Sequence, residues 1–469
     1  MYQLGWGQLN ENQNQPDSIL QWNHLQLDIV GFLAILGESA VVSTSQVATL
    51  SRMFFLPRLL PAPQALLRPS RPDKLQPISG QAVGVTSGNK RDYINFLGHV
   101  LANADSLPDY AVKCIKIKRI HNEGVVRARP FGPTWWVAVL GCVLSVVILA
   151  ISVWQQDGMA ILADICLSFL STLVGVVNKW NLNLPKRAGD KNHYTPPGDV
   201  ILRYPKGSFV VIRCSEDVAR ELFFAPEGIE YDIETPWKYR MIALVGSILL
   251  MFGVIFLGNA RTNVQVAFAV AYMILNAAYW IIAALPKRFH WDTSAFEVIP
   301  EAFAEPQMNR EMLREAIVKQ LKEGKQDICL KTIDKDLPKT IPPKAQCKDF
   351  VSYNKTFTQA LWKVIIATRE IEWIRKSDAA PTSEAWDRWL ALAHEVALNA
   401  PEPTNIDQKY KGKMRSIQHY HVPDWNAQGA LIDALNGVKQ QEIKKDQQKT
   451  ATNQTQSDLN MREDPSKTV

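Results

Sequence analysis

The chain has 469 residues, a formal charge of +6 and six cysteines without a CxxC pair. The small charge gives no indication of nucleic-acid binding, and the scattered cysteines exclude a zinc framework and a secreted disulfide scaffold. The first residues lack the basic and apolar parts of a signal peptide, so the first membrane-spanning segment is expected to direct insertion.

The N-terminal region, residues 1–132, is predicted to be cytosolic and helical, with a loop at 57–90. It contains one ambiguous apolar stretch, residues 29–50, which is long enough to span a bilayer. Glu38 and several polar residues make its insertion costly, which favours a buried or interfacial helix. Lys and Arg are absent before it, whereas Arg52 and Arg58 follow, and this pattern suits a fifth span.

Four later stretches are predicted transmembrane helices. A helix needs about 20 apolar residues to cross ~30 Å of hydrocarbon, and the stretches that meet this length are 134–154, 158–177, 241–260 and 264–285. Only the second contains a charged residue, Asp164. Tryptophans gather at the ends of these stretches, as amphipathic rings do at membrane interfaces. The short turns predict two helical hairpins, residues 134–180 and 241–286.

The distribution of Lys and Arg predicts the orientation of the spans. Basic residues precede the first span, flank the segment between the second and third, and follow the fourth. The two turns within the hairpins contain only one, Arg261. By the positive-inside rule, both termini and the central loop are expected to be cytosolic.

The central loop, residues 181–240, is predicted to form a small α+β module. Residues 199–214 contain two β-rich runs around a turn at Tyr204-Pro205-Lys206-Gly207. A short helix at 216–224 and a strand at 228–233 follow. The module is close to the lower size for independent folding.

The region after the spans, residues 287–400, is predicted to be cytosolic and helical. It contains a helix at 308–322, a linker at 331–348 and a helix pair at 357–376 and 383–399. Trp386, Trp389, Leu390 and Ala393 share one apolar face of the last helix, which indicates packing against its partner. Mixed loop and helix are expected at 401–438, and the Gln- and Lys-rich residues 439–469 are expected to be disordered.

These elements predict an α-helical polytopic membrane protein with four transmembrane helices as two hairpins, a small α+β cytosolic loop module, and helical cytosolic N- and C-terminal regions. The chain resembles a group of uncharacterised fungal integral membrane proteins. The resemblance rests on AILGESAVVSTSQ (34–46), DGMAILADICLSFLSTLVGVVNKW (157–180) and three further blocks at 198–227, 257–286 and 373–390. It implies the same architecture and no known activity.

Three polar residues are candidates for a site within the membrane. Asp164 must face the bundle, water or a partner, so it indicates an ion or proton path or, alternatively, a solvated carboxylate near the interface. Asn276 near the middle of the fourth span is predicted to be polar glue between helices. If the segment at 29–50 enters the membrane, Glu38 would be a second carboxylate in the same bundle as Asp164.

No catalytic, metal-binding or cofactor-binding residue is assigned. His419 and His421 are too few for a metal site, and nucleotide-binding and hydrolase motifs are absent from the sequence. We therefore expect a membrane-anchored binding or scaffold protein with a cytosolic protein partner. The alternative is an oligomeric channel or transporter that uses Asp164 and Asn276, with further copies of the chain as partners.

Overall fold

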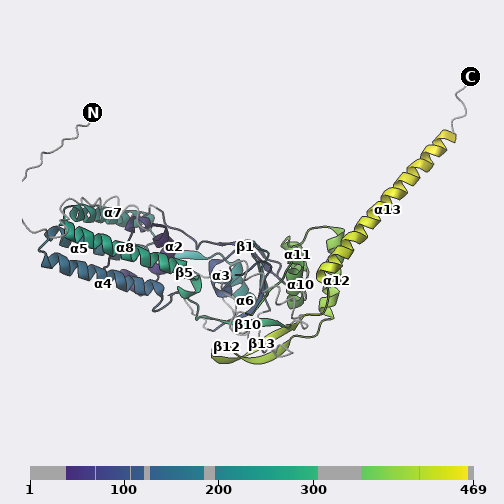
Figure 1. Cartoon of the computed structure of the whole chain (residues 1–469), viewed down its shortest axis with the longest axis horizontal. Coiled ribbons are helices and arrows are strands. Elements are labelled where there is room, and N and C mark those ends of the chain that lie inside the picture. The colour runs from purple at the N-terminus through teal and green to yellow at the C-terminus, as the bar shows by residue number, and fades with distance from the viewer. Residues whose placement is uncertain are drawn as a thin grey trace, which may run out of the picture. The chain divides into compact units, whose positions relative to one another are not determined.

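The computed structural model describes residues 38–68, 70–105, 107–120, 127–183, 196–304, 350–410 and 412–462 (Figure 1). The chain forms two compact units, each built from three segments. We call Met1–Arg71, Ala128–Trp180 and Tyr231–Leu285 the bundle unit. We call Pro72–Arg127, Asn181–Glu230 and Pro286–Val469 the sheet unit.

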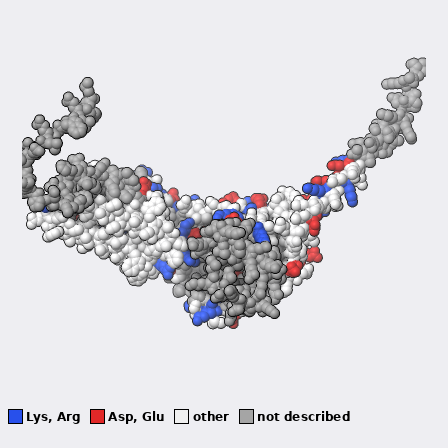
Figure 2. Space-filling model, viewed as in Figure 1, with Lys and Arg blue, Asp and Glu red and all other residues white. Residues whose placement is uncertain are grey.

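The bundle unit contains the four predicted spans. Among the described residues, four helices are long and apolar enough to cross a membrane: α4 (Pro133–Trp154), α5 (Gly158–Val177), α7 (Pro236–Gly258) and α8 (Thr262–Ala284). Proline at the first position favours the start of α4 and α7, and the Asp157 side chain caps α5. Large apolar side chains such as Val146, Phe169 and Ile281 are exposed. The visible surface of these helices in Figure 2 is almost free of charge, as contact with lipid requires.

The packing of the bundle differs from two simple hairpins. Helix α7 packs mainly along α5, and α8 packs mainly along α4, while α4 and α5 contact each other. Helices α7 and α8 are joined by a short turn but have few contacts with one another. The predicted connection is therefore present, but the second hairpin is stabilised by the first rather than by its own two helices.

A non-helical segment between α2 (Glu38–Thr49) and Arg71 enters the bundle and returns. Trp180, just after α5, donates its Nε1–H to the Gln46 carbonyl and to Thr49 Oγ1. Beyond the 3₁₀ turn η2 (Arg52–Phe55), the backbone N–H of Leu59 reaches the Gly141 carbonyl in α4 at 3.4 Å. After the second turn, η3 (Pro63–Leu66), the chain is back at the end of α5, where Asn178 donates to the Leu66 carbonyl.

We call residues 51–67 the re-entrant segment, because both of its ends lie at the C-terminal end of α5 and its middle lies between α4 and α5. The purple trace among the bundle helices in Figure 1 shows its position. The described part of the ambiguous stretch, α2, also contacts this end of the bundle, at Trp180. Residues 29–37 lie outside the described part of the chain.

The sheet unit is built on one mixed nine-stranded sheet. Its strands follow the order β12-β13-β10-β3-β7-β6-β1-β2, and β11 pairs with β3 outside this path. The pairs β3–β7 and β10–β13 are parallel, and the other pairs are antiparallel. The strands are β1 (Ile78–Gly84), β2 (Lys90–Ile94), β3 (Val112–Arg119), β6 (Val200–Arg203), β7 (Phe209–Arg213), β10 (Phe296–Ala304), β11 (Val351–Ser352), β12 (Thr404–Tyr410) and β13 (Lys413–His421).

This sheet corrects three predictions. The region 287–400 is not wholly helical, because it supplies β10 and β11. The segment 181–240 is not an independent module, because its strands β6 and β7 lie between strands from both flanking regions. The N-terminal region is not mainly helical, since it supplies β1, β2 and β3 beside the short helix α3 (Phe96–Ala102). The physical reason is that two short strands leave their edges unpaired and bury too little surface alone. The turn at 204–207 is confirmed, with Gly207 at a φ of 71°.

The remaining elements of the central loop are short. Helix α6 (Glu216–Ala219) continues into a π turn, η4 (Arg220–Phe224). Outside the large sheet, the described residues include the strands β4 (Arg127–Ala128), β5 (Trp180–Asn183), β8 (Gly228–Tyr231) and β9 (Trp291–Asp292), and the 3₁₀ turn η5 (Lys287–Phe289).

The C-terminal helix pair is confirmed in part, because the helix predicted at 357–376 is broken after Thr368, where Arg369 has a φ of 55°. Helices α10 (Phe357–Thr368), α11 (Glu372–Lys376) and α12 (Glu384–Leu398) share one core with the sheet. Trp389 is fully buried there, and its Nε1–H donates to the Ala427 carbonyl at 2.7 Å. Side-chain caps from Thr356 and Ser383 start α10 and α12.

Two C-terminal predictions differ from the structure. Residues 401–438 were expected to be loop and helix, but they contain the β12–β13 hairpin. The tail was expected to be disordered from residue 439, whereas helix α13 (Ala427–Arg462) continues well beyond it. Gln, Lys and Glu are good helix formers even without a core to bury, which explains this helix. The helix and linker predicted at 308–322 and 331–348 lie outside the described residues.

Candidate functional site

The predicted acid of the second span lies in a buried polar cluster between α4 and α5. Asp164 is 2% exposed, and Ser145 Oγ donates to it, at 3.2 Å from each carboxylate oxygen. Ser168 Oγ lies 2.7 Å from Ser145 Oγ. Asp164, Ser168 and Ser171 are spaced i, i+4 and i+7, so one face of α5 presents all three.

The depth of Asp164 makes this cluster unusual for a structural core. It lies six residues after Gly158, which is about 9 Å along the helix axis. The hydroxyl of Ser145 is its hydrogen-bond donor among the described residues, and no described cation forms an ion pair with it. A carboxylate at such depth costs free energy to insert into the membrane, and such groups face bundle interiors or solute paths.

The polar face of α5 continues into the re-entrant segment. Ser171 Oγ accepts the backbone N–H of Arg58 at 3.1 Å and donates to the Ser168 carbonyl at 2.8 Å. Two helix glycines make room for the segment. A Cβ at Gly141 would lie 2.8 Å from the Leu59 carbonyl oxygen, and one at Gly175 would lie 2.7 Å from the Phe54 carbonyl oxygen.

Arg58 is the functional candidate that sequence reasoning missed. Its side chain is 1% exposed, with the guanidinium carbon 4.3 Å from the centre of the Phe54 ring. Nη1 donates to the Met53 carbonyl at 3.0 Å. The signal that could have found it is a single cation within the apolar, proline-bounded run FFLPRLLP at 54–61.

The structure does not bring the three predicted residues together. Glu38 forms an ion pair with Arg68 at 3.3 Å, and both side chains are more than half exposed. Glu38 therefore does not belong to the Asp164 cluster, and the entry of its segment into the membrane stays a prediction. Asn276 is half-buried on α8, and its Oδ1 is buried without a hydrogen-bond partner among the described residues. Its predicted role in hydrogen bonding between helices stays a prediction.

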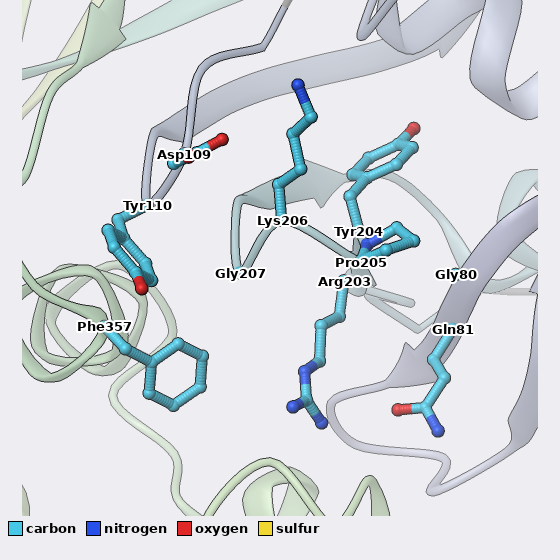
Figure 3. A pocket seen from close by; sticks show the side chains of 10 residues that line it. All are labelled: Gly80, Gln81, Asp109, Tyr110, Arg203, Tyr204, Pro205, Lys206, Gly207 and Phe357. Atoms are coloured by element: carbon cyan, nitrogen blue, oxygen red, sulfur yellow. The ribbon is translucent and has the colours of Figure 1, made fainter.

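The sheet unit has an open cleft of about 680 Å³ at the turn between β6 and β7 (Figure 3). Arg203 and Lys206 line it, but their side chains point in opposite directions. Arg203 is also held by the Asp378 carbonyl, at 3.1 Å from Nη1. The lining comprises Gly80, Gln81, Asp109, Tyr110, Arg203, Tyr204, Pro205, Lys206, Gly207 and Phe357.

A hydrogen-bonded relay lies behind this cleft. Tyr204 Oη is 2.9 Å from His99 Nδ1, and His99 Nε2 is 2.8 Å from Asp105 Oδ1. Burial raises the pKa of the Tyr204 phenol, so the phenol stays protonated and donates to His99. The hydrogen bond from His99 lowers the pKa of Asp105. Each polar group is satisfied by the next, which is what a structural core network requires.

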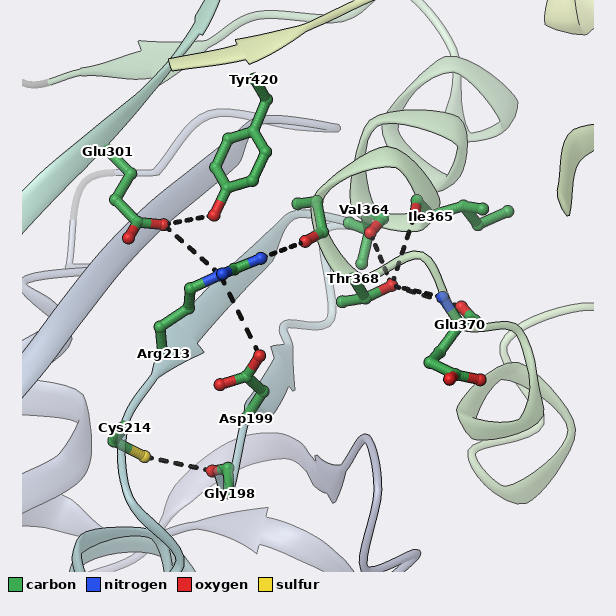
Figure 4. A network of polar contacts seen from close by, with 11 residues as sticks. Gly198, Asp199, Arg213, Cys214, Glu301, Val364, Ile365, Thr368, Glu370 and Tyr420 are labelled. Carbon is green, nitrogen blue, oxygen red and sulfur yellow. Dashed lines mark hydrogen bonds and ion pairs between the residues drawn. The ribbon is translucent and has the colours of Figure 1, made fainter. Parts of the chain in front are cut away.

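A second polar network joins four elements of the sheet unit (Figure 4). Arg213 Nε lies 3.8 Å from Glu301 and 4.0 Å from Asp199, and its Nη2 donates to the Ala367 carbonyl at 2.8 Å. Tyr420 Oη donates to Glu301 at 2.6 Å. Burial raises the pKa of both carboxyl groups, and Arg213 partly offsets this effect.

The structure supports no cofactor or metal assignment. Within the described ranges, no group of three or more His, Cys, Asp or Glu side chains is placed to hold a metal ion. His419 is buried, and this burial lowers its pKa. His421 lies beside the Thr404 hydroxyl at 3.1 Å.

Four long apolar helices with exposed apolar faces indicate a multi-pass membrane protein, which also contains a mixed sheet. Comparison with family models, with curated proteins and with solved structures gave no match to this chain. The resemblance to fungal membrane proteins stays a prediction.

Proposed function

We propose that the bundle unit carries a polar or charged solute across the membrane, as part of an oligomeric channel or transporter. The observation that supports this most is the re-entrant segment, whose irregular backbone lies between α4 and α5 beside the buried Asp164 cluster. Irregular backbone at membrane depth is tolerated where it is buried in protein or lines a cavity. An anchor needs neither this segment nor a buried carboxylate, and both are costly to insert.

The proposal requires more than one copy of the chain. Four spans are few for a complete path, and the buried Asp164 cluster of the described bundle lies on one seam between α4 and α5 rather than around a central channel. Further copies would complete the path.

The test is flux through liposomes that contain the purified full chain. We expect flux of protons, potassium or an anion above that of protein-free liposomes, and a loss of about tenfold or more in Asp164→Asn. Glu38→Gln is the matched control, because it also removes one carboxylate of the bundle unit but at an exposed position. A protein that stays monomeric and adds no flux for any of these ions would overturn the proposal.

A membrane-anchored binding protein is the second candidate, supported by the open cleft in the sheet unit. The partner search must use the full chain, because β10 and β13 pair within a sheet that also contains β3 and β7. A fragment that begins near Glu301 would leave that sheet incomplete. The candidate gains support if a partner is recovered with the wild type and lost in Lys206→Glu and Phe357→Ala. It fails if recovery is the same in all three.

A further inference from the structure

The Arg58 guanidinium is buried within the bundle unit. The backbone N–H of Arg58 bonds to Ser171, which lies six residues before the last residue of α5. Six residues correspond to about 9 Å of helix. The neighbouring residue Leu59 packs in the apolar cluster that contains Ala163 and Tyr272. The arginine is therefore well inside the length of the spans and cannot extend its head group to water.

One edge of this guanidinium has no geometrically formed hydrogen bond within the described part of the chain. Nη1 donates to the Met53 carbonyl, whereas Nε and Nη2 are buried and donate to no acceptor there. Nε and Nη2 lie on the same edge of the planar group, so their N–H bonds are parallel. Two parallel donors match the two oxygens of a carboxylate or phosphate group.

No acid lies beside Arg58 among the described residues. Its side-chain neighbours there include the Phe54 ring, the Cys142 thiol and the Tyr279 phenol, whose hydroxyl is within hydrogen-bonding reach of the guanidinium. Asp164 is bonded to Ser145 and lies seven residues before Ser171 on α5, about 10 Å away along the axis. Arginine does not lose its proton in proteins, and a buried charge without a counter-ion is strongly unfavourable.

We infer that Arg58 binds an oxyanion within the bundle, a carboxylate or phosphate group held in bidentate fashion by Nε and Nη2. The inference rests on the proposed transport function and names its solute class. In the structure both nitrogens are buried, so the proposed site is closed to solvent there. The anion reaches them when the re-entrant segment moves relative to α4 and α5.

The experiment measures anion binding by the purified full chain in a neutral detergent. Sodium acetate probes carboxylates, sodium phosphate probes free phosphate, and dioleoyl phosphatidic acid in mixed micelles probes a lipid phosphate. Sodium chloride at equal ionic strength is the control for screening. We expect saturable thermal stabilisation by one oxyanion and none by chloride. Equal responses to all four additions would overturn the inference, because screening would then explain them.

Variants assign the response to Arg58. Arg58→Lys keeps the charge but loses the two parallel N–H donors. We expect its oxyanion binding to be about tenfold weaker, which corresponds to about 1.4 kcal/mol of binding free energy. Arg58→Gln should abolish the response. Arg68→Gln removes a cation from the same region but at an exposed position, so it should bind like the wild type. Unchanged binding in Arg58→Gln would assign the anion elsewhere and overturn the inference.

If a variant fails to fold, saturation-transfer NMR of acetate on the wild type, with phosphate as competitor, still reports binding. The absence of saturation transfer would count against the site.

Two outcomes distinguish failure of the oxyanion site from failure of the transport function. Oxyanion binding without flux would leave the site standing and remove the transport function. Flux of protons or potassium without oxyanion binding would support the transport function and remove the oxyanion site.

Discussion

Each unit of the protein shields an arginine from solvent, Arg58 almost completely (1% exposed) and Arg213 largely (side chain 28% exposed), and the surroundings of the two arginines differ. In the sheet unit, Arg213 faces Glu301 and Asp199 and donates to a backbone carbonyl. In the bundle unit, Arg58 has one carbonyl partner, aromatic neighbours and no acid among the described residues. A buried cation with carboxylates around it stabilises a fold, whereas one without them is retained for another reason. The comparison separates a structural arginine from a functional one.

The largest effect is expected from breaking the network of the sheet unit. Arg213→Met leaves the buried Glu301 carboxyl group and the partly buried Asp199 carboxyl group without the arginine beside them, which should lower the free energy of unfolding by about 3 kcal/mol or more. Denaturant unfolding of the full chain in mild detergent, followed by tryptophan fluorescence, measures this change. A loss of less than about 1 kcal/mol in the free energy of unfolding is typical of exposed ion pairs and would show that the network does not stabilise the sheet unit.

A second prediction concerns the pH dependence of the sheet unit. Glu227 accepts the N–H groups of Phe96 and Leu97 at the start of α3, and burial raises the pKa of its carboxyl group to about 7. Between the ordinary value near 4.5 and this value, the unfolded state binds fewer protons than the folded state. Stability should therefore fall as the pH rises through this window, by on the order of 2 kcal/mol. In Glu227→Gln the part of this slope that Glu227 contributes should be lost, so the slope should become clearly shallower, and an unchanged slope would contradict the assignment.

The spans could be predicted from the sequence because a helix satisfies its own backbone and each apolar run is long enough by itself. The sheet could not, since its pairs join distant segments, such as Val112 with Phe209 and Ala302 with His419. Asp164 was predicted as a site because it is the one acid in an apolar run. Arg58 follows no helical or strand period, so only the return of the chain to the end of α5 reveals its burial.

A third prediction tests whether the re-entrant segment is held by the close approach of backbones. Gly141→Ala places a methyl group 2.8 Å from the Leu59 carbonyl oxygen, so the segment must shift, at a cost of about 1–2 kcal/mol. Gly158→Ala is the matched control on α5, because nothing lies within 4 Å of its added Cβ. Thermal unfolding in detergent compares the two. Equal stability of both variants would show that the segment does not pack against α4 as closely as we infer.

The smallest change in the free energy of unfolding is expected for Arg58→Met, which is compared directly with Arg213→Met. This variant removes a hydrogen bond to Met53 and the contact with the Phe54 ring, which together favour the wild type by about 1–2 kcal/mol. It also removes a buried charge without a described counter-ion, and replacing such groups by apolar side chains is often neutral or stabilising. The two effects oppose each other, so the free energy of unfolding should change by less than about 1 kcal/mol, or rise. A loss as large as that in Arg213→Met, measured in the same detergent, would mean that Arg58 is a structural arginine after all. A stable variant without oxyanion binding would instead show that the bundle keeps this cation for its ligand, at the expense of its own stability.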